Sequence, residues 1–585
     1  MSFKPHALVL ADFYKTGHPT MMPEGLTRLY SNFTPRSNRL APAAVSEDTS
    51  QKIDRIVFWK LQALIKEWLI DYFNEEFFKK SKEEVVAEYC RINDTALGPG
   101  TVLPDHIAAL HDLGYLPLRI KALPEGSLVD MKVAPFTVVN THDDFGWLAG
   151  RLEDLLSCEL WKGITAATIA FEFRKMLEKY ADLTGSPKDF VMWQGHDFSL
   201  RGLGGMMSGS ANQAGHLLSF FGTDTIPSIL YLEKYYSGKD TFVGGSVPAS
   251  EHSVAGANIL LVKRALETKG EYKGEKLEDQ PQHLSTLAQA ERIFLKNYIT
   301  KIVPTGVASY VGDTFSFWSL TTEIVPTLKD EILNRQPNAL GLAKVVFRPD
   351  SGDPVKILTG YKVSAAQSYD KPGYATAKEA IDDAPYNLVD AEAVKIGDTW
   401  YPCTWLNESD FEVDTTTTLS VPEVKGAVEC LWDIFGGTET SKGFKVLNER
   451  VGLIYGDSIT LGRGEEIMRR LMEKGFASCN VVFGIGSYTY EYNTRDTFGF
   501  AMKGTWCVID GEALDIYKDP ATDSGVKKSA KGLLRIEKEN GRFVQYDQQT
   551  PEQEAQGELK VVFEDGKLVK EYTLEEVRAN LASYL

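Results

Sequence analysis

The sequence lacks the features that mark membrane and secreted proteins. No run of apolar residues approaches the ~18 that a membrane-spanning helix needs. The apolar stretch near the N-terminus ends at Asp12 and is too short for the core of a signal peptide. We therefore predict a cytoplasmic protein that does not enter a membrane.

An excess of positive charge is absent as well. The chain has 63 lysines and arginines against 81 aspartates and glutamates, which gives a formal net charge of −18. Proteins that bind nucleic acids or anionic membranes present a basic surface, so this balance argues against both kinds of partner. A small anionic substrate stays compatible with it if a few basic side chains and backbone N–H groups gather locally.

Cysteine and histidine are scarce too. The six cysteines are scattered, without a Cys-x-x-Cys pair or the Cys/His spacing of a metal site, which favours reduced thiols. Only nine histidines occur in 585 residues. One of them, His252, lies in the stretch SVPASEHS (246–253), directly between a carboxylate and a hydroxyl. That octapeptide alone leaves open a structural imidazole, a general base and a nucleophile.

What the chain does contain, from residue 190 onward, is a repeated pattern. Short apolar, β-rich runs each end in Gly, Asp, Ser, Arg or His, and helical segments such as 282–299 and 464–474 separate several of them. The alternation predicts parallel β/α units. Polar residues at the carboxyl ends of parallel strands are typical of an α/β barrel's active site, so we predict an irregular, TIM-like barrel. The six runs are 190–198, 241–253, 307–315, 343–353, 451–458 and 480–487.

The segments outside this pattern suggest further elements. Apolar residues near helical spacing predict a long amphipathic helix over 55–79 and another helix over 165–184. Residues 116–141 are β-rich and interrupted by Pro and Gly, which predicts a small sheet. Residues 362–445 break the β/α rhythm, and we interpret them as an inserted, mostly peripheral subdomain. With 585 residues, more than one domain is expected.

Two sets of residues have the chemistry of a substrate site. Asp313, Asp350 and Asp457 each follow a predicted strand, where carboxylates can hold ribose hydroxyls or Mg²⁺, although any one of them could instead cap a helix. The stretch FGIGSYTYEYNTRD (483–496) has small residues that let backbone N–H groups converge on an anion, with Arg495 near its end. This pattern indicates a phosphate site.

Several longer motifs together resemble one known family. They are ADFYK (11–15), LYSNF (29–33), GHDFSLRG (195–202), FGTDT (221–225), SVPASEHS (246–253), RPDSG (348–352), YGD (455–457), NTRD (493–496) and YKDP (517–520). In this order they resemble the nicotinamide phosphoribosyltransferases, which are type II phosphoribosyltransferases. The resemblance covers most of the chain outside 362–445. It implies attack by the pyridine nitrogen of nicotinamide on C1 of phosphoribosyl pyrophosphate, giving nicotinamide mononucleotide and pyrophosphate.

The resemblance also implies roles for individual residues. Phe198 and Tyr14 match the two aromatics that stack on the nicotinamide ring, with Tyr14 donated by a second subunit, and Asp224 matches the acceptor for the amide N–H. Asp313 and Asp350 match catalytic carboxylates near the ribose. The other substrate-binding matches are Ser309, Arg201, Arg348, Gly456, Asp457, Gly486, Ser487 and Arg495. Arg36, Lys503 and Lys527 match phosphate-binding residues of the partner subunit.

The same resemblance assigns a role to His252, as the histidine that ATP phosphorylates to pull synthesis forward. It implies Mg²⁺, held mainly by the pyrophosphate with Asp313 or Asp350 as further candidate ligands, and ATP as a co-substrate. It further implies a homodimer. The expected domains are a discontinuous α/β domain (1–160 with 496–585), which contributes to the partner's active site, and a barrel domain (161–495) with the insertion at 362–445.

Departures from the family pattern leave rival interpretations open. Ser487 stands where the family often has glycine in the phosphate loop, and Ser458 and Thr460 follow Gly456-Asp457 where a second carboxylate is common. The nearest rival is a nicotinate phosphoribosyltransferase with an acid substrate. A rival of another class is a catalytically silent binding protein with the same fold, for which losses among the phosphate and ribose residues would be expected.

Overall fold

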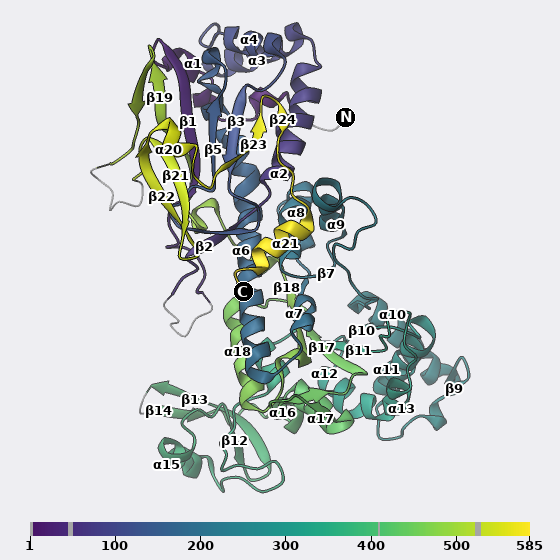
Figure 1. Cartoon of the computed structure of the whole chain (residues 1–585). Helices are drawn as coiled ribbons and strands as arrows, with labels where there is room; N and C mark the ends of the chain where they lie inside the picture. The colour runs from purple at the N-terminus through teal and green to yellow at the C-terminus, as the bar shows by residue number, and fades with distance from the viewer. Residues whose placement is uncertain (1–3, 45–50, 408–409, 521–527) are drawn as a thin grey trace. The chain divides into compact units, whose positions relative to one another are not determined.

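A computed structural model describes residues 4–44, 51–407, 410–520 and 528–585 (Figure 1). The chain divides into two compact units. Unit 1 comprises 1–175, 199–244 and 490–585, and unit 2 comprises 176–198 and 245–489. The N- and C-terminal parts thus share one unit, and residues 199–244 belong to it as well; the domain boundaries expected at 160/161 and 495/496 stay predictions.

Unit 1 is built on a seven-stranded antiparallel sheet, in the order β20-β19-β1-β5-β3-β23-β24. The strands are β1 (Leu26–Pro35), β3 (Leu118–Ala122), β5 (Phe136–Asn140), β19 (Phe500–Ile509), β20 (Glu512–Asp515), β23 (Lys560–Glu564) and β24 (Lys567–Leu568). Segments from both ends of the chain therefore pair in one sheet. The strands predicted over 116–141 are confirmed: β3 and β5 lie in this sheet, and β4 (Ser127–Asp130) pairs with β2 in a separate two-stranded sheet.

The prediction of a helix over 55–79 is wrong for its first residues. Residues Arg55–Phe58 form strand β2, which pairs antiparallel with β4, and helical structure begins only at Leu61. Ile56, Val57 and Phe58 are almost fully buried, so pairing and burial on both faces of the strand outweigh the helical spacing of the apolar residues. The helix predicted over 165–184 is confirmed and starts earlier, as α6 (Glu153–Thr184).

Helices complete unit 1. They include α3 (Lys82–Leu97), α4 (Asp105–Leu113), α8 (Met206–Gln213), α9 (Ile226–Leu232), α20 (Pro551–Glu554) and α21 (Leu574–Ala582). Ser81 caps α3 by accepting a hydrogen bond from the Glu84 N–H, and Thr573 and Glu576 form a capping box at α21. Among the described residues we find no helix whose length and hydropathy would suit a membrane span.

Unit 2 contains the predicted parallel strands. They pair in the order β10-β11-β17-β18-β6 and form a curled half-barrel, so the fold is α/β as predicted. The bounds are β6 (Gly195–Asp197), β10 (Ala308–Val311), β11 (Val345–Arg348), β17 (Val451–Tyr455) and β18 (Val481–Ile485). Every residue of β10 and β17 is buried, as expected for strands covered on both faces.

Two of the six predicted β-rich runs differ from expectation. Residues Lys188–Gln194 form helix α7, and only Gly195–Asp197 continues as strand β6. Residues 241–253 form no named strand; they contain only isolated bridge residues, one of which joins Ala249 to Ser309, and helix α10 then begins at His252. Proline and paired glycines in this run limit the regular hydrogen bonding that a strand requires.

The helices around the half-barrel include those predicted from the spacing. They are α10 (His252–Lys269), α11 (Thr286–Asn297), α14 (Pro354–Thr359) and α18 (Leu461–Glu473). Within 362–445, a three-stranded antiparallel sheet of β12 (Ala393–Ile396), β13 (Thr399–Asn407) and β14 (Asp410–Val413) packs with α15 (Ala377–Asn387). Buried residues such as Ala380, Leu388 and Phe411 give this part its own apolar cluster.

Candidate active site

The carboxyl ends of the parallel strands carry most of the singled-out residues of unit 2. Asp313 follows β10, Arg348 ends β11, Asp457 follows β17, Gly486 follows β18 and Phe198 follows β6. Parallel pairing brings these ends to the same edge of the sheet, for example Val311 beside Arg348. The sequence prediction that these residues gather is therefore confirmed for unit 2.

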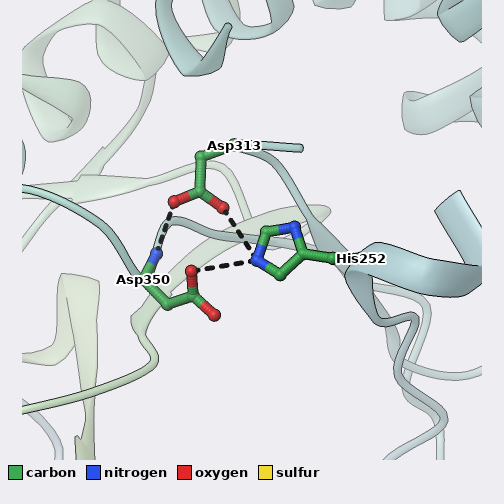
Figure 2. A group of neighbouring side chains, drawn as sticks. All are labelled: His252, Asp313 and Asp350. Carbon is green, nitrogen blue, oxygen red and sulfur yellow. Dashed lines mark hydrogen bonds and ion pairs between the residues drawn. The ribbon is translucent and has the colours of Figure 1, made fainter. Parts of the chain in front are cut away.

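At this edge, His252 lies against two carboxylates (Figure 2). Its Nε2 is 3.1 Å from Asp350 Oδ1 and 3.7 Å from Asp313 Oδ1, and its Nδ1 is 3.1 Å from Thr314 Oγ1. The imidazole is 48% exposed, whereas the Asp313 side chain is 6% exposed. His252 is thus oriented by three groups and still open to a reactant.

Asp313 is held in its ionised form. Its Oδ2 accepts hydrogen bonds from the N–H groups of Asp350 (3.0 Å) and Ser351 (2.9 Å) and from Ser351 Oγ (2.5 Å). Burial alone would raise the pKa of Asp313, but these bonds and the charge that His252 can carry outweigh burial and lower that pKa. Its buried Oδ1 accepts no hydrogen bond within the described part of the chain.

The backbone around His252 is fixed by Ser250. The Val311 N–H donates to Ser250 Oγ at 2.9 Å, and the Ser250 N–H donates to the Ser309 carbonyl at 2.9 Å. Arg348 Nη2 donates to the Ser250 carbonyl at 2.6 Å, and its guanidinium lies 6.0 Å from the Phe198 ring centre. The loop before α10 is therefore tied to the ends of β10 and β11.

Glycines allow close approach where two neighbouring loops meet. A Cβ at Gly486 would lie 2.7 Å from Asp457 Oδ1, and a Cβ at Gly456 would lie 3.0 Å from Asp350 Cβ. Any larger residue at Gly486 would displace the Asp457 carboxylate. Ser487 begins the short helix α19 (Ser487–Glu491) directly after Gly486 and is half-buried.

Negative charge dominates the edge. Tyr455 Oη donates to the Gly352 carbonyl at 2.9 Å. Burial raises the pKa of Tyr455, and the nearby carboxylates of Asp313, Asp350 and Asp457 raise it further. A cation or a basic group of a ligand would balance this charge.

The same cluster has the donors of a metal site. His252, Asp313 and Asp350 each offer one ligand atom, and these three atoms lie within 4.8 Å of one another. The buried Asp313 Oδ1, which no hydrogen-bond donor of the described residues reaches, is the observation that fits a cation there. Carboxylate oxygens are the ligands that Mg²⁺ prefers, so these residues fit the predicted metal.

The remaining predicted site residues belong to unit 1. Tyr14 is 61% exposed, and Arg201 and Asp224 are exposed as well. Arg495 Nη2 lies 3.6 Å from Asp496 Oδ1. Arg36 Nε donates to the Gly499 carbonyl at 3.0 Å, and Lys503 Nζ lies 3.3 Å from Glu153 Oε1. Lys527 lies outside the described residues. The roles of all these residues stay predictions.

Sequence reasoning missed three hydroxyl residues: Thr314 and Ser351, which contact the cluster directly, and Ser250, which fixes the loop before His252. Thr314 and Ser351 each follow a singled-out aspartate by one residue, and Ser250 precedes His252 by two. Hydroxyls at such offsets commonly bond to neighbouring loops, which is the signal that could have pointed to them.

The model of the nicotinate phosphoribosyltransferase (NAPRTase) family matches residues 193–567. A protein of Acinetobacter baylyi named nicotinamide phosphoribosyltransferase is 47% identical over 585 residues, covering 100% of this chain and 99% of that protein. One of Xanthomonas campestris with the same name is 26% identical over 588 residues, covering 99% of each chain.

A crystal structure of human nicotinic acid phosphoribosyltransferase aligns with 98% of this chain and 93% of that one, at 13% identity and a TM-score of 0.46. The family match spans well over half of the sequence, including the strands that carry the His252 cluster. The chain therefore belongs to the nicotinate phosphoribosyltransferase family.

Proposed function

We propose that this enzyme transfers the phosphoribosyl group of phosphoribosyl pyrophosphate to nicotinamide, as a step of NAD salvage. We choose nicotinamide over nicotinate as the substrate because the chain is 47% identical, over its whole length, to a relative named nicotinamide phosphoribosyltransferase. In the reaction, the pyridine nitrogen forms a bond to C1 of the ribose while the bond from C1 to the pyrophosphate oxygen breaks. The nitrogen attacks with its neutral lone pair, so no general base is needed.

The carboxylates at the sheet edge suit this chemistry. Positive charge develops on the ribose as pyrophosphate departs, and fixed negative charge nearby stabilises it. Asp313 is suited to this role because its lowered pKa keeps it ionised at neutral pH. We assign Asp313 and Asp350 as the residues that would hold Mg²⁺ together with the pyrophosphate. When bound, this ion neutralises the charge on the leaving group.

We further propose that ATP phosphorylates His252. An imidazole nitrogen would form a bond to the γ-phosphorus while the bond to ADP breaks, and water would later hydrolyse the phosphohistidine. His252 is the first residue of the 18-residue helix α10, where the helix dipole favours an added negative charge. The contacts to Asp350 and Thr314 orient the ring for this step.

Specificity for the amide is assigned to Asp224. A carboxylate accepts a hydrogen bond from an amide N–H but repels the carboxylate of nicotinate, a difference worth about 10²-fold or more in discrimination. The stacking roles proposed for Phe198 and Tyr14 suit the flat, electron-poor ring.

The experiment that tests this function is a product assay. Phosphoribosyl pyrophosphate is supplied with nicotinamide or with nicotinate, each with and without ATP, and the mononucleotides are separated and quantified. We expect nicotinamide mononucleotide as the product, formed faster with ATP. In Asp224→Asn, the preference for nicotinamide over nicotinate should be smaller. Equal turnover of both bases by the unmodified enzyme would contradict the proposal and favour the nicotinate activity that the family name describes.

A homodimer with shared sites is proposed for the working unit. Tyr14, Arg36 and Lys503 belong to segments far in sequence from the barrel motifs, and the exposed Tyr14 ring is available to a partner chain. The test mixes two inactive variants, Tyr14→Ala and Asp313→Ala. Shared sites predict that each heterodimer regains about half of the full activity, since one of its two sites has neither lesion, and that a randomly mixed population regains about a quarter. If the subunits exchange and no activity returns, each site is built within one chain.

A further inference from the structure

A cavity lies in unit 1, on the face of the antiparallel sheet. Its volume is about 280 Å³, and strands β1, β3, β5 and β19, which lie side by side in Figure 1, form its floor. Helix α20 and Leu533 of β21 (Leu533–Glu539) form its wall. None of its lining residues belongs to the predicted substrate site.

The strand register explains why this floor is both aromatic and basic. Tyr30 of β1 is opposite Trp506 of β19 on one side and Val139 of β5 on the other, and Val139 is opposite Arg119 of β3. Residues directly opposite one another point to the same face of a sheet. Lys121 follows Arg119 by two residues and so shares this face.

Tyr30 provides an independent sign of a ligand. The residue is 3% exposed; its hydroxyl has the Thr137 side chain and the Leu534 backbone as near polar neighbours but makes no hydrogen bond of good geometry within the described part of the chain. A buried hydroxyl left without a partner costs about 1–3 kcal/mol, so most such groups in folded proteins are paired. Burial and the negative charge of Glu554 raise the pKa of Tyr30, which keeps the hydroxyl protonated.

Three cations border the cavity, and each is held by a carboxylate of the same unit. Lys121 Nζ lies 2.6 Å from Glu554 Oε2. Arg28 is paired with Asp143, and Arg119 with Glu564. The Arg119 and Glu564 side chains are 43% and 36% exposed, so water screens this pair and an incoming anion can compete for the guanidinium.

We propose that this cavity binds a small planar aromatic ring that carries a phosphate. The ring would pack on Tyr30 and Trp506, the Tyr30 hydroxyl would gain a partner, and the phosphate would take the place of a carboxylate on Arg119. Guanidinium groups bind phosphate through two parallel hydrogen bonds, and aromatic side chains favour flat ligands. The cavity volume limits the ligand to about one ring and one phosphate.

Phenyl phosphate is the probe. Its affinity for the protein is measured by isothermal titration calorimetry and compared with the affinities of phenol and of inorganic phosphate. We expect phenyl phosphate to bind the unmodified protein at least tenfold more tightly than either fragment. Arg119→Gln should weaken it about tenfold, since a charged hydrogen bond is lost. Glu564→Gln should tighten it severalfold, because it releases Arg119 from its competing carboxylate. The exposed Arg91→Gln, on α3, is the matched control and should change nothing.

Tyrosine and tryptophan variants provide a second readout. Tyr30→Phe keeps the ring but removes the hydroxyl, so binding should weaken while the fold remains intact. Phenyl phosphate should quench part of the fluorescence of the unmodified protein, and Trp506→Phe should lose that part. No binding at millimolar concentration overturns the proposal. So does unchanged affinity in both Arg119→Gln and Tyr30→Phe, which would place the bound probe elsewhere, including the predicted substrate site.

Discussion

Two carboxylates lie close to strand β10 of unit 2, and their surroundings differ. Asp313 follows the strand and accepts three hydrogen bonds beside His252, which lower its pKa. Glu291, on α11, is 3% exposed and accepts a hydrogen bond from Tyr310 Oη at 3.1 Å. Burial raises the pKa of Glu291 to about 7, and the Tyr310 bond offsets only part of this.

The difference shows what fixes the charge of a carboxylate here. Both groups are largely removed from water, which disfavours ionisation. N–H and O–H donors converge on Asp313 because the loops after β10 and β11 meet at the sheet edge. On the other side of the strand, regular helix packing leaves Glu291 a single donor. The loops at the carboxyl edge of this sheet therefore lower the pKa of Asp313, whereas burial beneath α11 raises the pKa of Glu291.

The largest effect is expected at Asp313. Asp313→Asn keeps the shape but removes the charge, and we expect kcat/KM to fall about 10³-fold because the developing positive charge loses its fixed partner. Steady-state kinetics with phosphoribosyl pyrophosphate and nicotinamide measures this. A variant that keeps a tenth or more of the activity would show that the ionised carboxylate is not what the site requires.

The carboxyl group of Glu291 should affect the stability of the fold and have no effect on catalysis. The folded-state pKa of Glu291, about 7, is above the unfolded value of 4.5. Its contribution to stability is therefore complete below pH 4.5 and is lost as pH rises through 7, by up to about 3 kcal/mol. Glu291→Gln should remove this part of the pH dependence.

Urea denaturation of both proteins at several pH values between 4.5 and 8 measures the difference. We expect the variant to gain relative stability as pH rises, with kcat within about twofold of the unmodified enzyme. Equal pH dependence in both proteins would mean that Glu291 is ionised in the folded state, and the contrast with Asp313 would fail.

A substitution at His252 tests whether this imidazole, held beside Asp313 and Asp350, is a nucleophile. His252→Ala should abolish acid-labile phosphate on the enzyme and lower catalytic efficiency with ATP about tenfold, while slow ATP-independent synthesis persists. Radiolabelled ATP followed by acid and alkali treatment detects the phosphohistidine. The exposed His283→Ala is the matched control and should retain the label. If the unmodified enzyme takes up no label and ATP changes no rate, the imidazole has a binding role only.

Thr314 should give the smallest effect. Thr314→Val removes the hydrogen bond to His252 Nδ1 without changing the side-chain volume much. We expect phosphorylation of His252 to slow about threefold, because the ring loses one of its orienting contacts, while the KM for nicotinamide stays unchanged. Thr314→Ser keeps the hydroxyl and should restore the rate. A loss of equal size in Thr314→Ser would point to the methyl group instead.

Much of the candidate site could be predicted because its residues lie at fixed positions relative to strands. Asp313, Arg348 and Asp457 follow or end short apolar runs, and parallel pairing leaves their ends at one edge. The same reasoning failed for residues 55–58, which were predicted as helix, and for residues 190–194, which were predicted as strand. Both segments have apolar patterns that suit either a helix or a strand. Pairing with β4 made residues 55–58 a strand, whereas residues 190–194 continue helix α7, which buries Val191 and Gln194.

The sequence by itself determined the acidic charge, the α/β alternation and the residue types gathered at the sheet edge, since these depend on composition and on neighbours along the chain. Tertiary structure decided which of two buried carboxylates ionises, because the donors to Asp313 come from a loop 37 or 38 residues away. It also decided the cavity floor around Tyr30, where the aromatic partner Trp506 comes from the other end of the chain. Such pairings follow from register and packing between distant segments, which local patterns do not encode.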